Sequence, residues 1–241
     1  MRVVVCLPTY NERENIEPMV RALDDVFRRH DLDARVLVID DSSPDGTGEI
    51  ADRLADEFSF LSVLHRPSKE GLGPAYLAGF VWALATDADR IVEMDCDLSH
   101  DPEDLPRLLA ASADADLVLG SRYVEGGGTR NWGLGRRLVS RFGSLYARII
   151  LGVGIHDLTG GFKCFRRTVI EEIGLEQITT KGYAFQIETT YRALKAGCRV
   201  VEVPIVFAER EAGSSKMSRG IVLEAITKVP TLRLRSLLSR L

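Results

Sequence analysis

Short runs of β-branched and other apolar residues alternate along the chain with longer segments in which apolar positions recur every three or four residues. The short runs are typical of strands buried on both faces of a sheet, and the longer segments are typical of amphipathic helices. The sequence predicts strands at residues 2–7, 35–40, 61–65, 90–95, 116–121 and 199–207. It predicts helices at residues 15–27, 49–58, 74–85 and 101–111.

The alternation of strands and helices implies right-handed crossovers, and therefore a mostly parallel sheet with helices on both faces. After residue 121 the rhythm changes to a Gly-rich loop, a long helix, a further helix and the last strand. Neither a Pro/Ser-rich linker nor a repeat at a fixed period divides the chain. We therefore expect one α/β domain over residues 1–218, followed by a basic amphipathic helical tail at residues 219–241.

The amino-acid composition limits the classes of protein to which this chain can belong. The 241 residues are 45% hydrophobic and 27% charged, which suits one substantial core. Lys and Arg number 31 against 35 Asp and Glu, and the net charge of -4 argues against a nucleic-acid-binding protein. The four Cys lack zinc-site spacing, so we expect reduced thiols in the cytoplasm. An uncharged apolar run of about 18 residues is absent, so we do not expect a membrane span.

Polar residues follow three of the predicted strands at the point where each strand ends. Residues 9–12 follow the first strand, residues 40–42 the second, and Asp95 and Asp97 the fourth. Any one of these clusters, taken alone, is better explained by a turn or a helix cap. In an open parallel sheet, however, ligands bind beyond the carboxyl ends of the strands. Three such clusters at one edge therefore predict a binding site there.

Two carboxylates separated by one residue can both reach one hard divalent cation, which also takes water and substrate phosphate oxygens as ligands. Asp95 and Asp97 have this spacing, and they predict a site for Mg²⁺ or Mn²⁺. No G-x-G-x-x-G sequence follows any strand, and the phosphate-binding loop G-x-x-x-x-G-K-[ST] is missing too. A nucleotide would therefore be held by carboxylates, a metal ion and basic side chains.

Seven motifs, in this order, resemble those of one known family. They are LPTYNERENI, VIDDSSPDGT, EGLGPAY, EMDCDLSHDPEDLP, LVLGSRYVEGGG, DLTGGFKCFRR and VPIVFAEREAGSSKMS. From about residue 2 to residue 218 the chain resembles inverting glycosyltransferases of family 2, and among them the polyprenol-phosphate (dolichol-phosphate) mannose synthases. The resemblance implies an A-type glycosyltransferase fold with a Rossmann-like sheet.

The resemblance also implies roles for residues at the matching positions. It implies that the nucleotide sugar is bound by Pro8, Tyr10, Glu12, Val38, Asp40, Asp95, Cys96, Asp97, Arg122, Arg210 and Lys216. The implied metal ligands are Asp95, Asp97 and Ser99, which stands where some relatives carry Gln. The implied contacts to the acceptor phosphate are Arg122, Arg136, Arg210 and Lys216. The residues expected at the reacting centre are Asp97, Arg122 and Asp157, and for Asp157 a cap or turn role is the alternative.

The resemblance implies that mannose passes from GDP-mannose to a polyprenyl monophosphate. A divalent ion and basic side chains stabilise charge on the departing diphosphate. The second ionisation of a phosphate monoester lies near pH 6, so the acceptor oxygen is already a nucleophile and needs no general base. A single displacement then inverts the anomeric configuration. Two alternatives stay open: a polyprenyl-phosphate glucosyltransferase using UDP-glucose, and a nucleotide-sugar-binding module without turnover.

A polyprenyl acceptor brings the enzyme to a membrane, because each buried methylene is worth about 0.8 kcal/mol. The segment 129–148 carries five Arg and no acid, with apolar residues at helical spacing. It is either an interfacial helix, with Trp132 as an anchor, or a helix that packs on the core. The tail is similar, with a Leu stripe after a predicted break at Pro230. We expect peripheral attachment to the cytoplasmic face of the membrane, with pairing of two copies as the competing use of the stripe.

Overall fold

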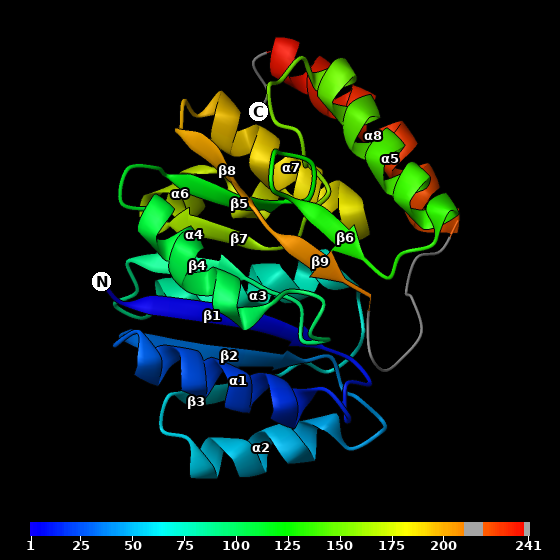
Figure 1. The fold of residues 1–241 in the computed structure, drawn as a ribbon. Coiled ribbons are helices and arrows are strands. Elements are labelled where there is room, and N and C mark those ends of the chain that lie inside the picture. Colours follow the sequence, from blue (N-terminus) through cyan, green and yellow to red (C-terminus); the bar gives the residue numbers. More distant parts are fainter. Residues whose placement is uncertain (210–218, 239–241) are drawn as a thin grey trace.

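A seven-stranded sheet runs through the middle of the protein in a computed structural model that describes residues 1–209 and 219–238 (Figure 1). The strand order is β3-β2-β1-β4-β7-β5-β8, and only β7 runs antiparallel to its neighbours among these strands. The strands are β1 (Val3–Thr9), β2 (Ala34–Asp40), β3 (Leu61–His65), β4 (Arg90–Glu93), β5 (Leu117–Ser121), β7 (Lys163–Arg166) and β8 (Val200–Pro204). The mostly parallel sheet is confirmed.

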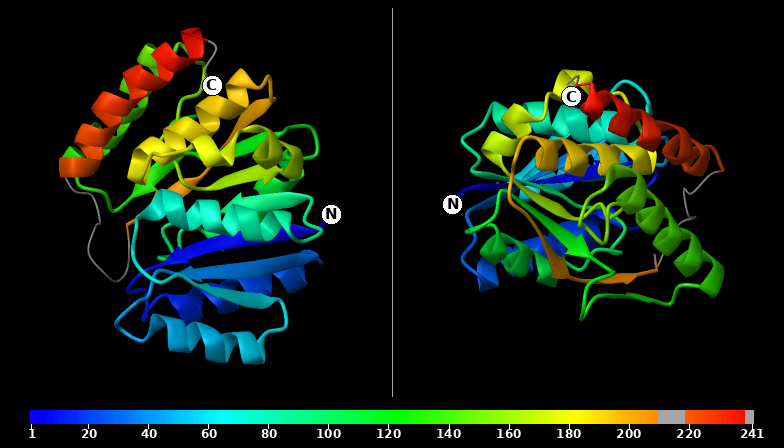
Figure 2. Two further views of the ribbon diagram at one scale, coloured as in Figure 1. Left: turned by 180° about the vertical axis from the view of Figure 1, so that it is seen from behind. Right: turned by 90° about the horizontal axis from the view of Figure 1, so that it is seen from above.

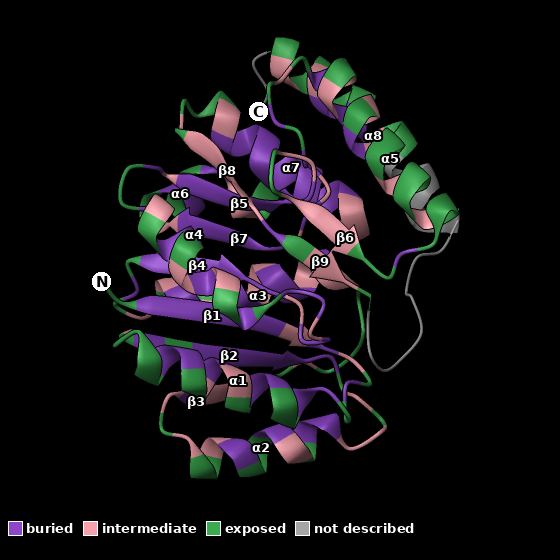
Figure 3. Cartoon of the chain, viewed as in Figure 1, coloured by how far each residue is buried: buried purple, intermediate pink, exposed green. Residues whose placement is uncertain are grey.

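Helices cover both faces of this sheet, and each face has its own apolar core. On one face lie α1 (Ile16–Arg29), α2 (Thr47–Glu57) and α4 (Leu105–Ala111), which follows the short helix η1 (Pro102–Asp104). On the other lie α3 (Leu72–Leu84), α6 (Arg167–Glu172) and α7 (Gly182–Lys195), with the short helix η2 (Leu175–Gln177) before α7. Figure 3 shows the inner strands of the sheet buried between these layers, whereas the outermost strand β8 is only partly buried. Burial on both faces explains why the strands read as continuous apolar runs.

Three strands depart from the sequence-based prediction. The strand predicted at residues 199–207 is divided into β8 and β9 (Val206–Ala208), and β9 pairs with the unpredicted β6 (Gly128–Arg130) in a second, two-stranded sheet. Pro204 lacks the N–H that a continuing ladder would use at this point. Strand β7 was also not predicted. It is four residues long and starts at a fully buried Lys163, so it does not have an apolar strand pattern.

Helices α5 (Leu134–Leu151) and α8 (Arg219–Leu237) lie side by side at one end of the molecule, outside the layers that flank the sheet (Figures 1 and 2). Helix α8 also packs against α7, and its Val229 and Leu232 belong to the same core as α3 and α7. None of the helices in the described part of the chain is long and apolar enough to span a membrane.

The break predicted at Pro230 is wrong, because α8 continues through this residue. A proline inside a helix leaves the carbonyl four residues earlier without its usual N–H donor. Here that carbonyl belongs to Ile226, and it accepts a hydrogen bond of 2.9 Å from the hydroxyl of Tyr146 on α5. About two turns further along α8, Arg233 donates to the carbonyl of Leu151 at 3.0 Å. The neighbouring helix therefore supplies the bond that Pro230 removes.

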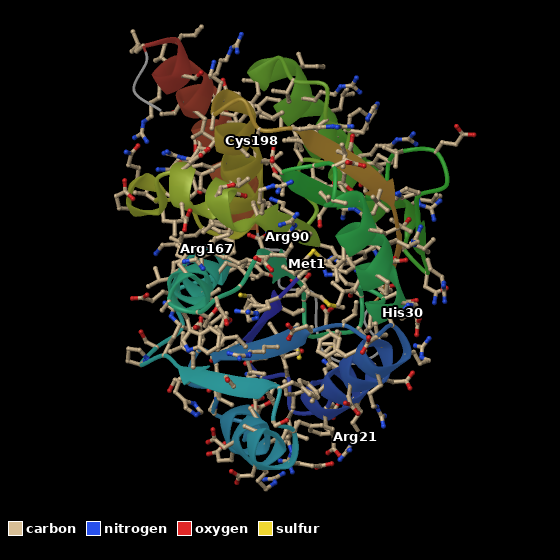
Figure 4. The ribbon with its side chains drawn as sticks, turned by 90° about the vertical axis from the view of Figure 1, so that its left-hand side faces the viewer. Met1, Arg21, His30, Arg90, Arg167 and Cys198 are labelled. Carbon is tan, nitrogen blue, oxygen red and sulfur yellow. The ribbon has the colours of Figure 1, made fainter. Side chains whose placement is uncertain are left out.

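At the amino-terminal edge of the sheet, which faces the viewer in Figure 4, Arg90 and Arg167 form structural hydrogen bonds. Arg90 donates to the carbonyl and hydroxyl oxygens of Ser112 at 2.8 and 2.9 Å. Arg167 donates to the carbonyl of Leu84 at 2.6 Å. The opposite edge is where the predicted site residues gather.

Replacing Tyr146 by Phe should lower the free energy of unfolding by about 1 kcal/mol, because the carbonyl of Ile226 loses its donor. Urea unfolding of Tyr146→Phe, Pro230→Ala and the double variant forms a cycle that checks this origin. With Ala at 230 the helix supplies its own N–H, so Tyr146→Phe should then cost less. An equal cost in both backgrounds would contradict this explanation of the unbroken helix.

Candidate functional site

The loops after β1, β2 and β4 lie together at the carboxyl edge of the sheet. Strand β1 lies between the other two, with Thr9 paired to Asp40 on β2 and Cys6 paired to Glu93 on β4. Each loop contains one non-glycine residue in the left-handed region, at Asn11 (φ 56°), Ser42 (φ 58°) and Leu98 (φ 59°). This conformation costs about 1 kcal/mol for an ordinary residue. Such strain is concentrated at functional sites.

Two buried carboxylates at this edge are held by short local bonds. Asp40 accepts from the hydroxyl of Ser43 at 2.5 Å and from its backbone N–H at 3.2 Å. Glu12 accepts from the side-chain amide of Asn15 at 2.7 Å, and its backbone N–H donates to Thr47 at 2.9 Å. Both carboxylates are therefore fixed in position where β1 and β2 end.

The other residues expected near the nucleotide differ in how much side chain they present. Pro8 and Tyr10 are half-buried, and the ammonium of Lys69 lies 3.8 Å from the centre of the Tyr10 ring. Val38 and Cys96 lie inside the core shared with α1 and α2. A ligand at this edge would therefore meet only the backbone of Val38 and Cys96.

The loop after β4 brings its two aspartates to the same edge. Asp97 is buried and accepts from the backbone N–H of Ser99 at 3.1 Å, while the side chain of Asp95 is 26% exposed. The backbone N–H of Asp95 donates to Nδ1 of buried His100 at 3.0 Å. Burial lowers the pKa of His100, which agrees with a neutral ring that accepts at Nδ1. His100 thus fixes the backbone of this aspartate loop.

Two buried ionisable residues lie opposite each other in the sheet directly before this loop. Glu93 on β4 is paired with Lys163 on β7, and both are fully buried. Lys163 also donates to the carbonyl of Gln186 at 2.7 Å and to the hydroxyl of Thr189 at 3.0 Å. Burial raises the pKa of Glu93 to about 7 and lowers that of Lys163 to about 8. Lys163 therefore links β7 to α7 beneath the aspartate loop, with Glu93 as its neighbour on β4.

Arg122, at the end of β5, forms a bidentate ion pair with Asp157, and both side chains are buried. Its Nε and Nη2 donate to the two carboxylate oxygens at 2.7 Å each, and its backbone N–H donates at 3.0 Å. Glu202 on β8 accepts from the backbone N–H of Asp157 at 2.9 Å. Burial raises the pKa of Asp157, but the Arg122 charge and hydrogen bonds outweigh it, so the pKa lies below the usual value. Asp157 therefore holds the Arg122 side chain in place, which is more than a turn or helix-cap role.

Trp132 is only 8% exposed, so the expectation that it anchors the protein in a membrane is wrong. Its ring packs edge-on against Phe207 on β9, with 5.4 Å between the ring centres. The guanidinium groups of Arg136 and Arg122 lie 4.2 and 5.6 Å from the Trp132 ring. Cation–π attraction and burial hold the indole between the two arginines and β9.

Phe207 also contacts His100, at 5.1 Å between ring centres, and the backbone N–H of Ala208 donates to the carbonyl of Ser99 at 3.1 Å. Strand β9 thereby joins the aspartate loop to Trp132 and the two arginines beside it. The structure thus brings together Asp95, Asp97, Ser99, Arg122, Arg136 and Asp157 through direct contacts or shared neighbours. Arg210 and Lys216 lie outside the described residues.

The aspartate loop offers oxygen ligands that suit a divalent cation. Across residues 1–209 and 219–238, no group of three or more His, Cys, Asp or Glu side chains is arranged to hold a metal ion. The hydroxyl oxygen of Ser99 is buried beside Asp97 and has no hydrogen-bond partner among the described residues. Two carboxylates and a hydroxyl fit Mg²⁺ or Mn²⁺, which commonly take their other ligands from water and substrate phosphates.

Replacing Asp157 by Asn should destabilise the protein by about 3–5 kcal/mol, because it leaves the buried Arg122 charge without its counter-ion. The lowered pKa means that the carboxylate stabilises the fold above the unfolded Asp pKa of about 4, and that this contribution is lost as pH falls through the folded value. Urea unfolding at pH 7 and between pH 5 and 3 measures both effects.

The control for this prediction is Asp25→Asn, which removes an exposed partner of Arg29 and should leave the unfolding midpoint unchanged. Wild-type stability in Asp157→Asn at pH 7, or an unfolding difference that does not shrink on acidification, would contradict the role assigned to the pair.

Comparison with known proteins places the chain in a family. The sequence model of glycosyl transferase family 2 matches residues 4–174. An undecaprenyl-phosphate mannosyltransferase of Micrococcus luteus is 51% identical over 229 residues, covering 95% of this chain and 93% of that protein. A polyprenol monophosphomannose synthase of Mycolicibacterium smegmatis is 51% identical over 243 residues, covering 99% and 89%.

Solved structures resemble the fold as a whole. Glucosyl-3-phosphoglycerate synthase of Mycobacterium tuberculosis, in complex with Mn²⁺ and UDP-glucose, matches with a TM-score of 0.66 at 20% identity, covering 99% of this chain and 78% of that one. Its complex with Mn²⁺, UDP and glucosyl-3-phosphoglycerate matches with a TM-score of 0.64 at 21% identity, covering 99% and 79%. This likeness concerns the fold alone. With the family match and the two relatives, it confirms that the chain belongs to glycosyl transferase family 2 and has the A-type glycosyltransferase fold.

Proposed function

We propose that this protein transfers mannose from GDP-mannose to a polyprenyl (dolichyl-type) monophosphate with inversion, giving polyprenyl-phosphate β-mannose and GDP. The proposal rests on one observation. The acidic loop with Asp95 and Asp97 and the fixed Arg122 are linked by side-chain contacts at one edge of the sheet. A sugar nucleotide and a lipid phosphate both require phosphate-binding groups around one reacting centre. The 51% identity to two polyprenyl-phosphate mannosyltransferases supports the choice of sugar and acceptor.

The nucleoside would bind where β1 and β2 end. Buried Asp40 and Glu12 offer fixed acceptors for ribose hydroxyls or base N–H groups, and the half-buried Tyr10 offers an aromatic face. Pro8 and the backbone of Val38 would shape this part of the site. The Asp95–Asp97 loop then receives the diphosphate.

The metal ligands would be Asp95, Asp97 and Ser99, with Mg²⁺ or Mn²⁺ as the ion. When bound, such an ion stabilises the negative charge that develops on the departing diphosphate. His100 holds the loop by accepting from the backbone N–H of Asp95, and buried Glu93 and Lys163 support it from the sheet. The chain thus keeps the two carboxylates in place before the substrate arrives.

Arg122 would contact phosphate oxygens of the donor or acceptor, with Arg136, Arg210 and Lys216 as further basic groups. Asp157 is committed to Arg122 by two bonds of 2.7 Å and is fully buried, so it is a positioning residue and not a general base. The acceptor does not require a base, because its phosphate is mostly a dianion near neutral pH. Its oxygen would attack the anomeric carbon, the bond to the diphosphate would break, and no covalent enzyme intermediate would form.

We also propose peripheral attachment to the cytoplasmic face of a membrane through the paired helices α5 and α8. Both helices expose large apolar side chains, and Figure 3 colours much of both helices as exposed. On α5 these side chains are Leu134, Leu138, Val139, Phe142, Leu145 and Ile149; on α8 they are Ile226, Leu234 and Leu237, and Leu238 directly follows α8. Neighbouring arginines suit anionic headgroups. Pairing of two copies through the same faces, giving a homo-oligomer, is the competing use.

Purified protein incubated with polyprenyl phosphate, Mg²⁺ or Mn²⁺ and either GDP-mannose or UDP-glucose should form a mannolipid and not a glucolipid. Asp97→Asn should lower kcat at least about 100-fold by removing a diphosphate-stabilising ligand, with an unchanged melting temperature. The matched control is Asp114→Asn on an exposed turn, which should keep full activity. Wild-type protein that makes only the glucolipid, or that binds GDP-mannose without turnover, would refute the proposed function.

Leu138→Ser together with Phe142→Ser should reduce sedimentation with anionic phospholipid vesicles, because two exposed apolar side chains are lost from α5. Added salt should weaken binding of the wild type. Light scattering of the free protein tests the competing use. A wild-type dimer that the double variant turns into a monomer, with vesicle binding unchanged, would favour pairing of two copies.

A further inference from the structure

The loop after β3 begins beside the ends of β1 and β2, because β3 is the neighbour of β2 in the sheet. His65 ends β3 and pairs with Asp40 on β2, which in turn pairs with Thr9 on β1. The backbone N–H of Arg66 donates to the carbonyl of Asp40 at 2.8 Å. Residues 66–71, here called the β3–α3 loop, therefore start at the edge where the nucleoside is proposed to bind.

Arg66 fixes the β3–α3 loop in place. Its guanidinium forms an ion pair with Asp41, which directly follows β2, and another with Glu70 of its own loop at 2.6 Å. The side chains of Arg66 and Asp41 are 10% and 6% exposed, so this contact is mostly shielded from water. Arg66 thus fastens the β3–α3 loop to the loop after β2, and its charge is already matched by two carboxylates.

Lys69 is the second cation of the β3–α3 loop, and it lies over Tyr10. Its ammonium is 3.8 Å from the centre of the Tyr10 ring. Within residues 1–209 and 219–238 it forms no ion pair, and the adjacent Glu70 pairs with Arg66 instead. A cation–π contact at an exposed site is worth only about 0.5–1 kcal/mol. The contact orders the ammonium at this aromatic face and leaves its three N–H donors for a ligand.

The nucleoside end of the site combines acceptors with a donor. Glu12 and Asp40 are buried carboxylates, which accept hydrogen bonds, whereas the ammonium of Lys69 only donates them. Guanine has the complementary edge, because its N1–H and 2-amino groups donate and its O6 and N7 accept. Adenine has a donating 6-amino group in the place of O6. An ammonium at that position therefore suits guanine and opposes adenine.

We infer that Lys69 recognises the guanine base of the donor by donating to O6 and N7. The inference rests on the proposed function, because it names the residue that selects the nucleotide of that reaction. Arg66 is then a positioning residue, which holds the loop that carries Lys69. A diphosphate also attracts an ammonium group, and the test separates contact with the base from contact with the phosphates.

Calorimetric titration compares the wild type, Lys69→Met and a matched variant, Lys195→Met, with GDP, IDP and ADP in the presence of Mg²⁺. The three nucleotides carry the same diphosphate, and IDP keeps O6 and N7 but lacks the 2-amino group. Lys195→Met removes the same charge from the exposed end of α7. In Lys69→Met the affinities for GDP and IDP should fall about tenfold or more, because a charged donor is lost, and the affinity for ADP should not change. Lys195→Met should bind all three nucleotides like the wild type.

Mannosyl transfer gives a second measurement on the same variants. Lys69→Met should raise the KM for GDP-mannose about tenfold or more and leave kcat unchanged. The base is remote from the bond that breaks, so the contact is equally strong in the ground state and the transition state. A lower kcat at an unchanged KM would contradict a contact with the base.

Unchanged GDP affinity in Lys69→Met would overturn the inference. An equal loss for all three nucleotides would overturn it as well, because it would assign Lys69 to the diphosphate. The titrations contain neither sugar nor lipid, so they do not depend on turnover. A wild type that binds the nucleotides as expected but transfers no mannose would refute the proposed function and leave the base contact standing.

Discussion

The candidate site depends on one buried ion pair, between Arg122 and Asp157. A buried guanidinium is costly unless its donors are satisfied, and here one carboxylate accepts from Nε, Nη2 and the backbone N–H of the same arginine. Glu202 on β8 holds the backbone of Asp157, and Ser144 on α5 lies 3.5 Å from its carboxylate. The pair therefore sets the positions of β5, β8 and α5 relative to one another, and it keeps a permanent cation at the carboxyl edge of the sheet.

From this fixed cation a set of aromatic contacts leads to the acidic loop. Trp132 lies near Arg122, Phe207 packs against Trp132, and His100 packs against Phe207 and accepts from the backbone of Asp95. A shift in the position of β9 would therefore displace both the arginines and the aspartates. In the proposed reaction the aspartates act on the departing diphosphate, and the arginines contact phosphate oxygens of the donor or the acceptor. The aromatic contacts keep their spacing constant.

Apolar periodicity and turn residues predicted those parts of the fold that depend on short stretches of sequence. The buried strands and the positions of Asp95 and Asp97 directly after one of them follow from apolar runs and turn residues. Contacts between distant segments did not follow from them. Lys163 lies in a central strand although its side chain is ionisable, because its ammonium donates to Gln186 and Thr189 on α7. Pro230 sits inside a helix because Tyr146 supplies the missing bond. Trp132 read as a membrane anchor because its partners, Phe207 and Arg122, are remote in sequence.

The central claim is that the paired, oriented guanidinium of Arg122, and not positive charge alone, completes the phosphate site. Mannosyl transfer by Arg122→Lys tests it most directly, because lysine keeps the charge beside Asp157 but cannot form the two parallel bonds. With folding checked by circular dichroism, the account predicts a kcat lowered by about 100-fold or more while GDP-mannose still binds. Wild-type turnover in a folded Arg122→Lys protein would contradict it.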